Sequence, residues 1–561
     1  MSGRPFYSRS SGMKPTSRRA FILQAGLVTG AILLNGCIRR LSGGKPEYAH
    51  IKGKLAGPNA KAGHALRDKL PMPAPTTQQM VKTLIIGSGI SGLSAARWLL
   101  KQGETDFQLL ELEDHAGGNA YFGTNEVSAY PLGAHYIPIV NNDDKLLIDF
   151  LQEHQVITHF DKKGLPFYNE FYLCFDPEER LLINGHWQEG IVPDFGVADS
   201  DRKQIIRFFA LVTRLKNAKG NDGRYAFDIP LDNSSADDAY RKLDRISFKD
   251  YLKDNGFDSP YLLWYLNYCC KDDYGTPAQN VSAWAGLHYF SARKGTASNA
   301  DPNAVITWPE GNGWLMKRLR ETVKDHIKTG HLAYDVQIEG SGKVAVKVLD
   351  LKQNTSAVIY ADKVIMASPQ YVNQKLLKNT IRPGFDAGKL HYSPWLIANI
   401  TVNKLPSAAK GMVLCWDNVA YNTASVGYVN ANQQDIKLVE QQKVLTYYLP
   451  LCDKEPRIAR LAAYTRTYEQ WMDIVVPEME QMHPGITECI EQVEFWLWGH
   501  GMISPSVGYI WGDNRQQARL PINNQVFFAH TDLSGVSIFE EAFHQGIRSA
   551  QQVLADEHAA I

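Results

Sequence analysis

The sequence predicts an α/β fold, and three patterns support this prediction. An apolar segment at residues 81–86 runs into closely spaced glycines and then into a stretch with helical periodicity, which is typical of a strand, a tight turn and a helix. Residues 205–212 carry apolar side chains at positions i, i+3, i+4 and i+7, a spacing that predicts an amphipathic helix. The apolar segments 396–402 and 443–449 have the composition of strands.

The composition narrows the class of protein. The chain has 561 residues, of which 44% are hydrophobic and 21% are charged, so it carries enough apolar material for a large core and is not disordered, collagen-like or polytopic in a membrane. Lys+Arg and Asp+Glu are both 59, so no basic excess indicates nucleic-acid binding. The cysteines form no CxxC pair and have no histidine at a zinc-site spacing, so no metal site is predicted.

Residues 1–37 have the features of an export signal. Paired arginines at 18–19 precede a weakly hydrophobic run from Ala20 to Gly36, and this resembles a twin-arginine signal. Leu34-Asn35-Gly36-Cys37 resembles a lipobox, which implies lipidation of Cys37. An uncleaved anchor helix is the alternative, although the run of 17 residues is short for a membrane span.

We therefore expect export by the twin-arginine machinery and a lipid anchor on the periplasmic side of a bacterial membrane. Ile38, where an inner-membrane retention signal would usually have Asp, slightly favours the outer membrane. Residues 38–80 are rich in glycine and proline and lack clear periodicity, which predicts a tether between anchor and body. A segment packed along the domain surface is the alternative.

The glycine turn after the first strand predicts a dinucleotide site. Gly87 allows the tight turn, Gly89 lets a pyrophosphate approach the backbone, and Gly92 lets the helix pack closely on the strand. Glu111 follows the second strand at 107–110 and can accept hydrogen bonds from ribose hydroxyls. The residues predicted to hold the dinucleotide are Gly87, Gly89, Ile90, Ser91, Gly92 and Glu111.

Further motifs resemble those of the flavin-containing amine oxidase and phytoene desaturase superfamily. Gly117-Gly118-Asn119 begins six positions after Glu111, where that superfamily has a second glycine pair near the FAD diphosphate. Gly133-Ala134-His135-Tyr136 resembles its short motif beside the flavin. Residues 308–315 resemble its P-x-G-G segment, and residues 526–542 resemble its closing strand and helix.

The resemblance implies FAD as the cofactor and a Rossmann-like FAD-binding domain assembled from the discontinuous segments 81–150, 301–375 and 501–561. Residues 151–300 and 376–500 would then form a mixed-sheet and helical substrate domain. The further residues that the resemblance places at the cofactor are Gly117, Gly118, Asn119, Gly133, Ala134, Val336, Asp532 and Phe539.

Candidate catalytic residues follow from the same resemblance. The segment 392–402 lacks the lysine that often holds a water beside the flavin in amine oxidases, and Asn399 is its only amide side chain. His135 would either contact the flavin or make a structural hydrogen bond, and His500 is a candidate for proton transfer. We therefore name His135, His500 and Asn399 as candidate catalytic residues.

The implied function is an FAD-dependent oxidoreductase that takes a hydride from a small organic substrate, an amine or polyamine by analogy. Asp272 and Asp273 would hold a cationic polyamine, or else form a solvated helix end. Two alternatives stay open: a flavin desaturase or dehydrogenase of a lipophilic substrate, and a non-catalytic flavin-fold lipoprotein of the envelope. The sequence does not identify the electron acceptor or the oligomeric state.

Overall fold

The computed structural model describes residues 48–406, 410–436 and 441–558. The chain divides into two units, Met1–Ile51 and Lys52–Ile561, and every sheet and helix described belongs to the second. The predicted export signal and Cys37 lie outside the described residues. In the part of the chain that the structure describes, no helix is both long enough and apolar enough to cross a membrane.

One sheet has seven strands and carries the glycine turn. They are β2 (Pro75–Ile86), β3 (Phe107–Leu110), β12 (Ile327–Lys328), β13 (His331–Ile338), β14 (Val344–Asp350), β15 (Thr355–Met366) and β21 (Val526–Phe528). β12, β3, β2 and β15 lie side by side and run parallel. The hairpin β13–β14 extends the first half of β15, and β21 pairs in parallel with its last three residues. Segments far apart in sequence therefore build one sheet.

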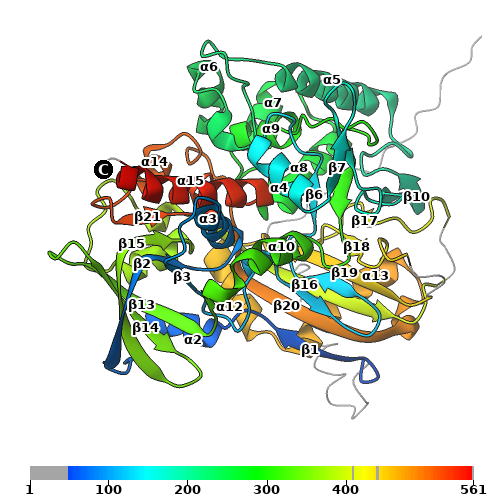
Figure 1. Ribbon diagram of the computed structural model, residues 1–561. Coiled ribbons are helices and arrows are strands. Elements are labelled where there is room, and N and C mark those ends of the chain that lie inside the picture. Colours follow the sequence, from blue (N-terminus) through cyan, green and yellow to red (C-terminus); the bar gives the residue numbers. More distant parts are fainter. Residues whose placement is uncertain (1–47, 407–409, 437–440, 559–561) are drawn as a thin grey trace, which may run out of the picture. The chain divides into compact units, whose positions relative to one another are not determined.

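Helices α3 (Ile90–Lys101) and α15 (Phe539–His558) contact this sheet and each other, and α10 (Gly313–Val323) packs against α3 (Figure 1). A Cβ atom on Gly546 would lie 2.1 Å from the carbonyl oxygen of Ser91, so α15 approaches α3 more closely than a larger residue would allow. Leu93, Leu99 and Ile547 are buried in the core that joins these helices to the sheet.

A second sheet has eight strands in the order β1-β20-β16-β19-β18-β17-β9-β10. They are β1 (Lys52–Ala56), β9 (Glu179–Ile183), β10 (His186–Glu189), β16 (Tyr392–Val402), β17 (Asp417–Ala420), β18 (Tyr428–Asn430), β19 (Lys443–Pro450) and β20 (Ile490–Ile503). Every residue of β16 is buried, because both faces of this central strand are covered.

Residues 52–80 are part of the fold. β1 pairs in parallel with β20, α2 (Ala60–Arg67) follows, and β2 begins at Pro75. The tether predicted over residues 38–80 therefore does not extend past residue 51, and from Lys52 on the chain follows the alternative of a segment packed on the domain. β1 and the first half of β2 are mostly exposed, so they show no alternating apolar pattern in the sequence.

Helices form most of residues 199–291. α5 (Asp199–Lys216), α7 (Phe248–Asp254), α8 (Pro260–Tyr274) and α9 (Ala283–Ser291) pack together as one helical layer (Figure 1). The predicted amphipathic face lies on α5, where Ile205, Phe208 and Val212 are buried. Trp284 on α9 is fully buried in the same core.

Shorter elements connect these layers, and the mixed sheets and helices together confirm the predicted α/β fold. The remaining helices and strands are β4 (Phe122–Thr124), β5 (Ala129–Pro131), β6 (Tyr136–Pro138), α4 (Lys145–Glu153), β7 (Ile157–Phe160), β8 (Pro166–Tyr168), α6 (Asp238–Arg241), β11 (Val305–Thr307), α11 (Gln370–Leu376), α12 (Pro456–Thr465), α13 (Tyr468–Met482) and α14 (Asp513–Ala518).

Candidate functional site

The glycine turn between β2 and α3 is crowded at two positions and open at a third. Gly87 has φ +106°, and a Cβ atom there would lie 2.8 Å from the carbonyl oxygen of Ala367. A Cβ atom on Gly92 would lie 1.9 Å from the carbonyl oxygen of Gly87, so the helix packs directly against the turn. A Cβ atom on Gly89 would meet no atom within 4 Å. The free space therefore lies at the N-terminus of α3.

α3 begins without a side-chain cap, because its N-cap residue is Gly89. The amide groups of the first helical turn have no intrahelical acceptor, so they are available to a phosphate. The second glycine pair lies directly opposite: Gly117 forms a bridge with Gly89, and its amide donates to the carbonyl of Ser88 at 3.0 Å. A Cβ atom on Gly118 would lie 3.2 Å from the Cα atom of Gly89. The two motifs form one backbone cradle that fits a diphosphate.

Glu111 lies beside this cradle at the end of β3. Its Oε2 atom accepts hydrogen bonds from the amide of Ser88 at 2.9 Å and from its hydroxyl at 2.6 Å, and its Oε1 atom accepts from the amide of Glu113 at 3.0 Å. A carboxylate has about four acceptor sites, so Glu111 keeps capacity for a ribose hydroxyl. These residues fit FAD, and they would hold its diphosphate and adenosine ribose.

The other predicted cofactor residues contact different parts of the fold. The carboxamide of Asn119 donates to the carbonyl of Gly501 on β20, so it links the cradle to the second sheet. Ser91 uses its hydroxyl to bind the carbonyl of Ala542 at 2.9 Å, which ties α3 to α15. Val336 is buried in β13, and Phe539 is buried at the start of α15.

Asp532 is fully buried near the end of β21. Its Oδ2 atom accepts from the amide of Gln370 at 2.7 Å and from the hydroxyl of Tyr392 at 2.5 Å. This carboxylate therefore joins α11 to β16.

The motif Gly133-Ala134-His135-Tyr136 lies against the second sheet. The hydroxyl of Tyr448 donates to the carbonyl of Gly133 at 3.1 Å, and the indole of Trp498 donates to the carbonyl of Leu132 at 2.5 Å. The ring of His135 lies 4.6 Å from that of Tyr448 and 5.6 Å from that of Trp416. Burial lowers the pKa of His135 to about 4, so its imidazole is neutral at physiological pH.

His500 and Asn399 lie in different surroundings from His135. The ring of His500 stacks on Tyr371 at 4.5 Å, and burial, followed by the charge of Arg460, lowers its pKa to about 3. Asn399 is 2% exposed inside β16, and its carboxamide oxygen accepts from the hydroxyl of Thr446 at 2.7 Å. No hydrogen bond or ring contact joins these three residues in the described part of the chain, and their catalytic roles stay predictions.

The structure also brings together three carboxylates that the sequence did not group. We call Glu179 of β9, Asp272 of α8 and Asp417 of β17 the carboxylate cluster. Glu179 and Asp417 are register partners in parallel strands, and Asp272 interacts electrostatically with both. Burial and then Asp273 raise the pKa of Asp272 to about 7, and burial followed by Glu179 and Asp272 raises that of Asp417 well above its usual range.

Arg293 lies beside this cluster and pairs with Asp273 at 3.0 Å. Its positive charge is therefore matched by Asp273, and a cation bound beside the three carboxyl groups of the cluster would favour their ionised forms. Aromatic rings connect the cluster to the predicted flavin-side motif: Tyr136 interacts with Arg293 and Asp272, and Tyr448 interacts with Asp272 and Asp417. The cluster is thus contiguous with His135 and Tyr136.

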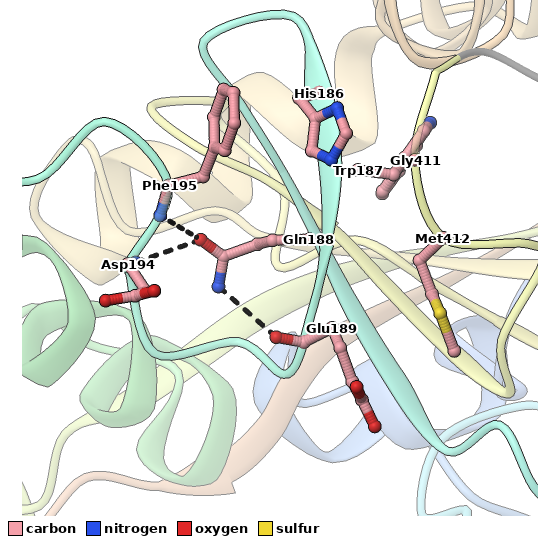
Figure 2. Close-up of a pocket in the computed structure, with 8 residues that line it drawn as sticks. All are labelled: His186, Trp187, Gln188, Glu189, Asp194, Phe195, Gly411 and Met412. Atoms are coloured by element: carbon pink, nitrogen blue, oxygen red, sulfur yellow. Dashed lines mark hydrogen bonds between the residues drawn. The ribbon is translucent and has the colours of Figure 1, made fainter.

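A separate groove of about 490 Å³ lies on the edge strand β10 (Figure 2). Gln188 closes one side of it, because its carboxamide oxygen accepts from the amides of Asp194 and Phe195 at 2.9 and 3.0 Å. His186 stacks on Phe195 at 4.4 Å. None of the predicted site residues lines this groove, so it is distinct from the candidate site.

Comparisons with known proteins agree with this geometry. The family model for flavin containing amine oxidoreductases matches residues 90–554. A flavin-containing amine oxidase of Oncorhynchus mykiss is 30% identical over 123 residues, which is 20% of this chain and 23% of that protein. Polyamine oxidase 7 of Oryza sativa subsp. japonica is 30% identical over 98 residues, 17% and 21% of the two chains. The chain therefore matches less than a quarter of the length of these curated relatives.

Two solved structures share the fold over most of the chain. A putrescine oxidase bound to putrescine has a TM-score of 0.60 at 16% identity, covering 85% of this chain and all of that one. The cyclohexylamine oxidase of Brevibacterium oxydans has a TM-score of 0.57 at 14% identity, covering 86% of this chain and all of that one.

Proposed function

The chain belongs to the flavin-containing amine oxidoreductase family, and from this premise we propose that it oxidises an amine with two positively charged nitrogens, a diamine or polyamine, with FAD as its cofactor. The carboxylate cluster is the observation that carries this proposal. It places several carboxyl groups, which a bound cation would ionise, next to the motif that resembles the flavin-side segment of the family. Bound FAD supplies the hydride acceptor.

Different side chains bind different parts of the substrate. The carboxylate cluster attracts the nitrogen that stays protonated, and the rings of Tyr136 and Tyr448 contact the methylene chain and add cation–π attraction. The neutral imidazole of His135 adds no positive charge that would repel the substrate. A lipophilic substrate fits this arrangement poorly, because it would cover these carboxyl groups without offering them a partner.

Changing Asp272 to asparagine tests the proposal. We expect KM for putrescine to rise about tenfold or more, which corresponds to about 1.4 kcal/mol, because one partner of the cationic nitrogen is lost. Butylamine, which has one nitrogen, is the matched substrate and should be affected far less. Steady-state kinetics with both amines measure the difference. An equal effect on both substrates would contradict recognition of a second charge.

The pH dependence of the same reaction gives an independent check. The pKa of Asp272 is raised to about 7, so the carboxyl gains a proton as the pH falls through 7 and loses its attraction for the substrate. We expect kcat/KM for putrescine to fall below about pH 7 in the wild type, and this part of the fall should be absent in Asp272→Asn. Both proteins experience the same ionisation of the substrate, so the difference between their profiles isolates the residue.

For its location, we propose export through the twin-arginine machinery and lipid anchoring at Cys37, on the periplasmic side of a bacterial membrane. The support is the sequence pattern of residues 18–37. Cys37→Ser is expected to abolish incorporation of labelled palmitate and to move the protein into the soluble fraction. A Cys37→Ser protein that stays membrane-bound would instead support the uncleaved anchor helix. Arg18→Lys combined with Arg19→Lys should leave the precursor in the cytoplasm.

A further inference from the structure

A small cavity lies at the start of α15, beside Arg293. It has a volume of about 10 Å³, which is room for about one water molecule, and its polar lining consists of Asn141, Asp144, Arg293 and Glu540. Arg293 is shared: it pairs with Asp273 beside the carboxylate cluster and also lines this cavity. Arg293 therefore links this cavity to Asp273, the chain neighbour of Asp272 in the carboxylate cluster.

Glu540 is the buried carboxyl of this cavity that lies at the start of α15. It is the second residue of α15 and 4% exposed, and the charged or titratable side chains that act on it are Arg293, Asp273, Asp144 and His544. Asn141 uses its carboxamide elsewhere, since it donates to Asp228 and the carbonyl of Ala292 and accepts from the amide of Lys294. Burial raises the pKa of Glu540 to about 7, so the carboxyl exchanges its proton near neutral pH.

The cavity also has a connection towards solvent. Asp144 caps α4 by accepting from the amide of Leu147 at 3.1 Å, and its second oxygen contacts Nε2 of His544 at 2.7 Å. His544 lies one helical turn after Glu540 on α15, and its side chain is 14% exposed. Asp144 raises the pKa of His544 against the opposing effect of burial, so this imidazole can carry a proton.

We propose that Glu540 accepts the proton that the substrate ammonium must release before hydride transfer, and passes it through the cavity water to Asp144 and His544. This route rests on the proposed function. The N–H bond of the ammonium breaks and its electron pair stays on nitrogen, while an O–H bond forms on Glu540 through intervening water. That O–H bond then breaks as the proton moves to the Asp144–His544 pair and to solvent. No electron is transferred in these steps, and Arg293 keeps its own proton and orients the water.

The route explains how the chain works without the lysine that it lacks in segment 392–402. Hydride leaves from a carbon next to a neutral amine, so a cationic substrate needs a group that removes one proton. The carboxylate cluster keeps the distal nitrogen charged, whereas Glu540 has a path along which a proton can leave. The two sets of carboxylates therefore have different roles.

The test uses Glu540→Gln in the FAD-loaded protein, because glutamine keeps the volume but cannot accept the proton. Putrescine is mixed anaerobically with the protein in weak buffer that contains a pH-indicator dye, and flavin absorbance is recorded together with proton release. In the wild type we expect proton release no later than flavin reduction. In Glu540→Gln we expect both to slow at least about tenfold, since a positioned acid–base group contributes that much or more.

Two controls keep the result specific. Glu541→Gln changes the neighbouring buried carboxyl, which accepts from the amide of Leu231 at 2.5 Å instead of lining the cavity, and should leave proton release as in the wild type. His544→Ala should delay the appearance of the proton in solution, and a high concentration of added buffer should shorten this delay. Thermal unfolding of each variant shows whether the fold is retained.

Infrared difference spectroscopy gives a readout that does not depend on turnover. We expect Glu540→Gln to lose one of the protonated-carboxyl bands that titrate near pH 7 in the wild type, whereas Glu541→Gln should keep that band and lose a different one. The signal of Asp272, whose pKa is also raised to about 7, should remain in both variants. Unchanged proton release and an unchanged infrared band in Glu540→Gln, with an active wild type, would overturn the route alone. A wild-type flavin that no diamine reduces would overturn the proposed function and the route with it.

Discussion

Changing Gly89 to valine is expected to abolish FAD binding while leaving the protein folded. The backbone at Gly89 is extended, with φ −67° and ψ −179°, a conformation that valine adopts readily. A Cβ atom there meets no protein atom within 4 Å, so the substitution causes no internal clash. The new side chain would occupy the space in front of the first amides of α3, where the diphosphate fits. We expect a loss of affinity of more than about 100-fold, roughly 2.7 kcal/mol.

The measurement is the amount of flavin per chain after gel filtration, together with the melting temperature without FAD. Gly92→Ala is the control in the same turn. Its Cβ atom would lie 1.9 Å from the carbonyl oxygen of Gly87, so this substitution disturbs internal packing, whereas Gly89→Val fills open space. Gly92→Ala should lower the free energy of unfolding by about 1–3 kcal/mol, as overpacking usually does. Full FAD occupancy in Gly89→Val would show that the cofactor does not lie at this turn.

The part of the site that the sequence predicted is contiguous in the chain. Residues 87–92 and Glu111 belong to one strand–helix–strand unit, so their spacing alone predicts that they meet. Gly117 and Gly118 could be added only through the resemblance, and the structure places them opposite Gly89. Local geometry of this kind needs no knowledge of the rest of the fold.

The carboxylate cluster could not be predicted in the same way. The adjacent Asp272 and Asp273 predict a paired-carboxylate site from sequence, but Glu179 and Asp417 meet only through the parallel pairing of β9 with β17. Short, mostly buried strands leave no period-2 pattern that would reveal their partner. The raised pKa values are likewise properties of the assembled protein, because burial is their largest cause.

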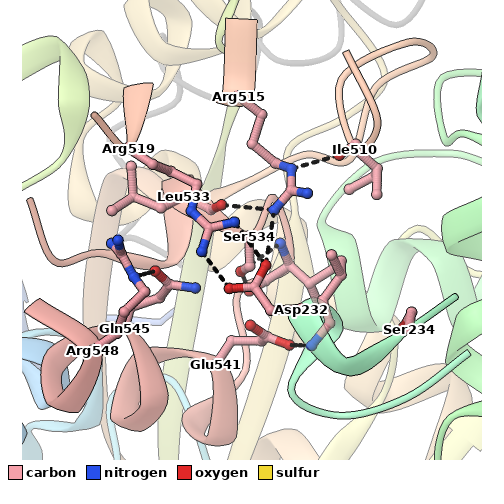
Figure 3. Close-up of polar contacts among 12 residues, drawn as sticks. Asp232, Ser234, Ile510, Arg515, Arg519, Leu533, Ser534, Glu541, Gln545 and Arg548 are labelled. Atoms are coloured by element: carbon pink, nitrogen blue, oxygen red, sulfur yellow. Dashed lines mark hydrogen bonds and ion pairs between the residues drawn. The ribbon is translucent and has the colours of Figure 1, made fainter. Parts of the chain in front are cut away.

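Three arginines, Arg515, Arg519 and Arg548, surround the carboxylate of Asp232 (Figure 3). Arg519 binds both carboxylate oxygens of Asp232, and Arg515 lies 3.5 Å from one of them. Arg548 is close enough to act on the same carboxylate. Arg515 is 2% exposed and also donates to the carbonyls of Ile510 and Leu533, so it cannot turn to solvent. Asp232 therefore neutralises the positive charge of Arg515, which is shielded from water.

Changing Asp232 to asparagine is accordingly expected to lower the free energy of unfolding by about 3 kcal/mol, because it leaves buried arginines without their counter-ion. Burial opposes ionisation of Asp232, but Arg519 and Arg515 outweigh it and hold its pKa below the usual value. A depressed pKa stabilises the fold above the ordinary carboxyl range, and this stabilisation disappears as the pH falls through the lower folded value.

Urea unfolding at several pH values measures both effects. The stabilities of the wild type and Asp232→Asn should differ most near neutral pH and converge under acid conditions, since protonation removes the same charge that the substitution removes. Asp238→Asn is the matched control, because its ion pair with Arg245 is 3.8 Å long and both side chains are exposed, and such pairs contribute about 0–1 kcal/mol. Equal stability of the Asp232→Asn and Asp238→Asn proteins would mean that solvent, rather than Asp232, balances the arginines.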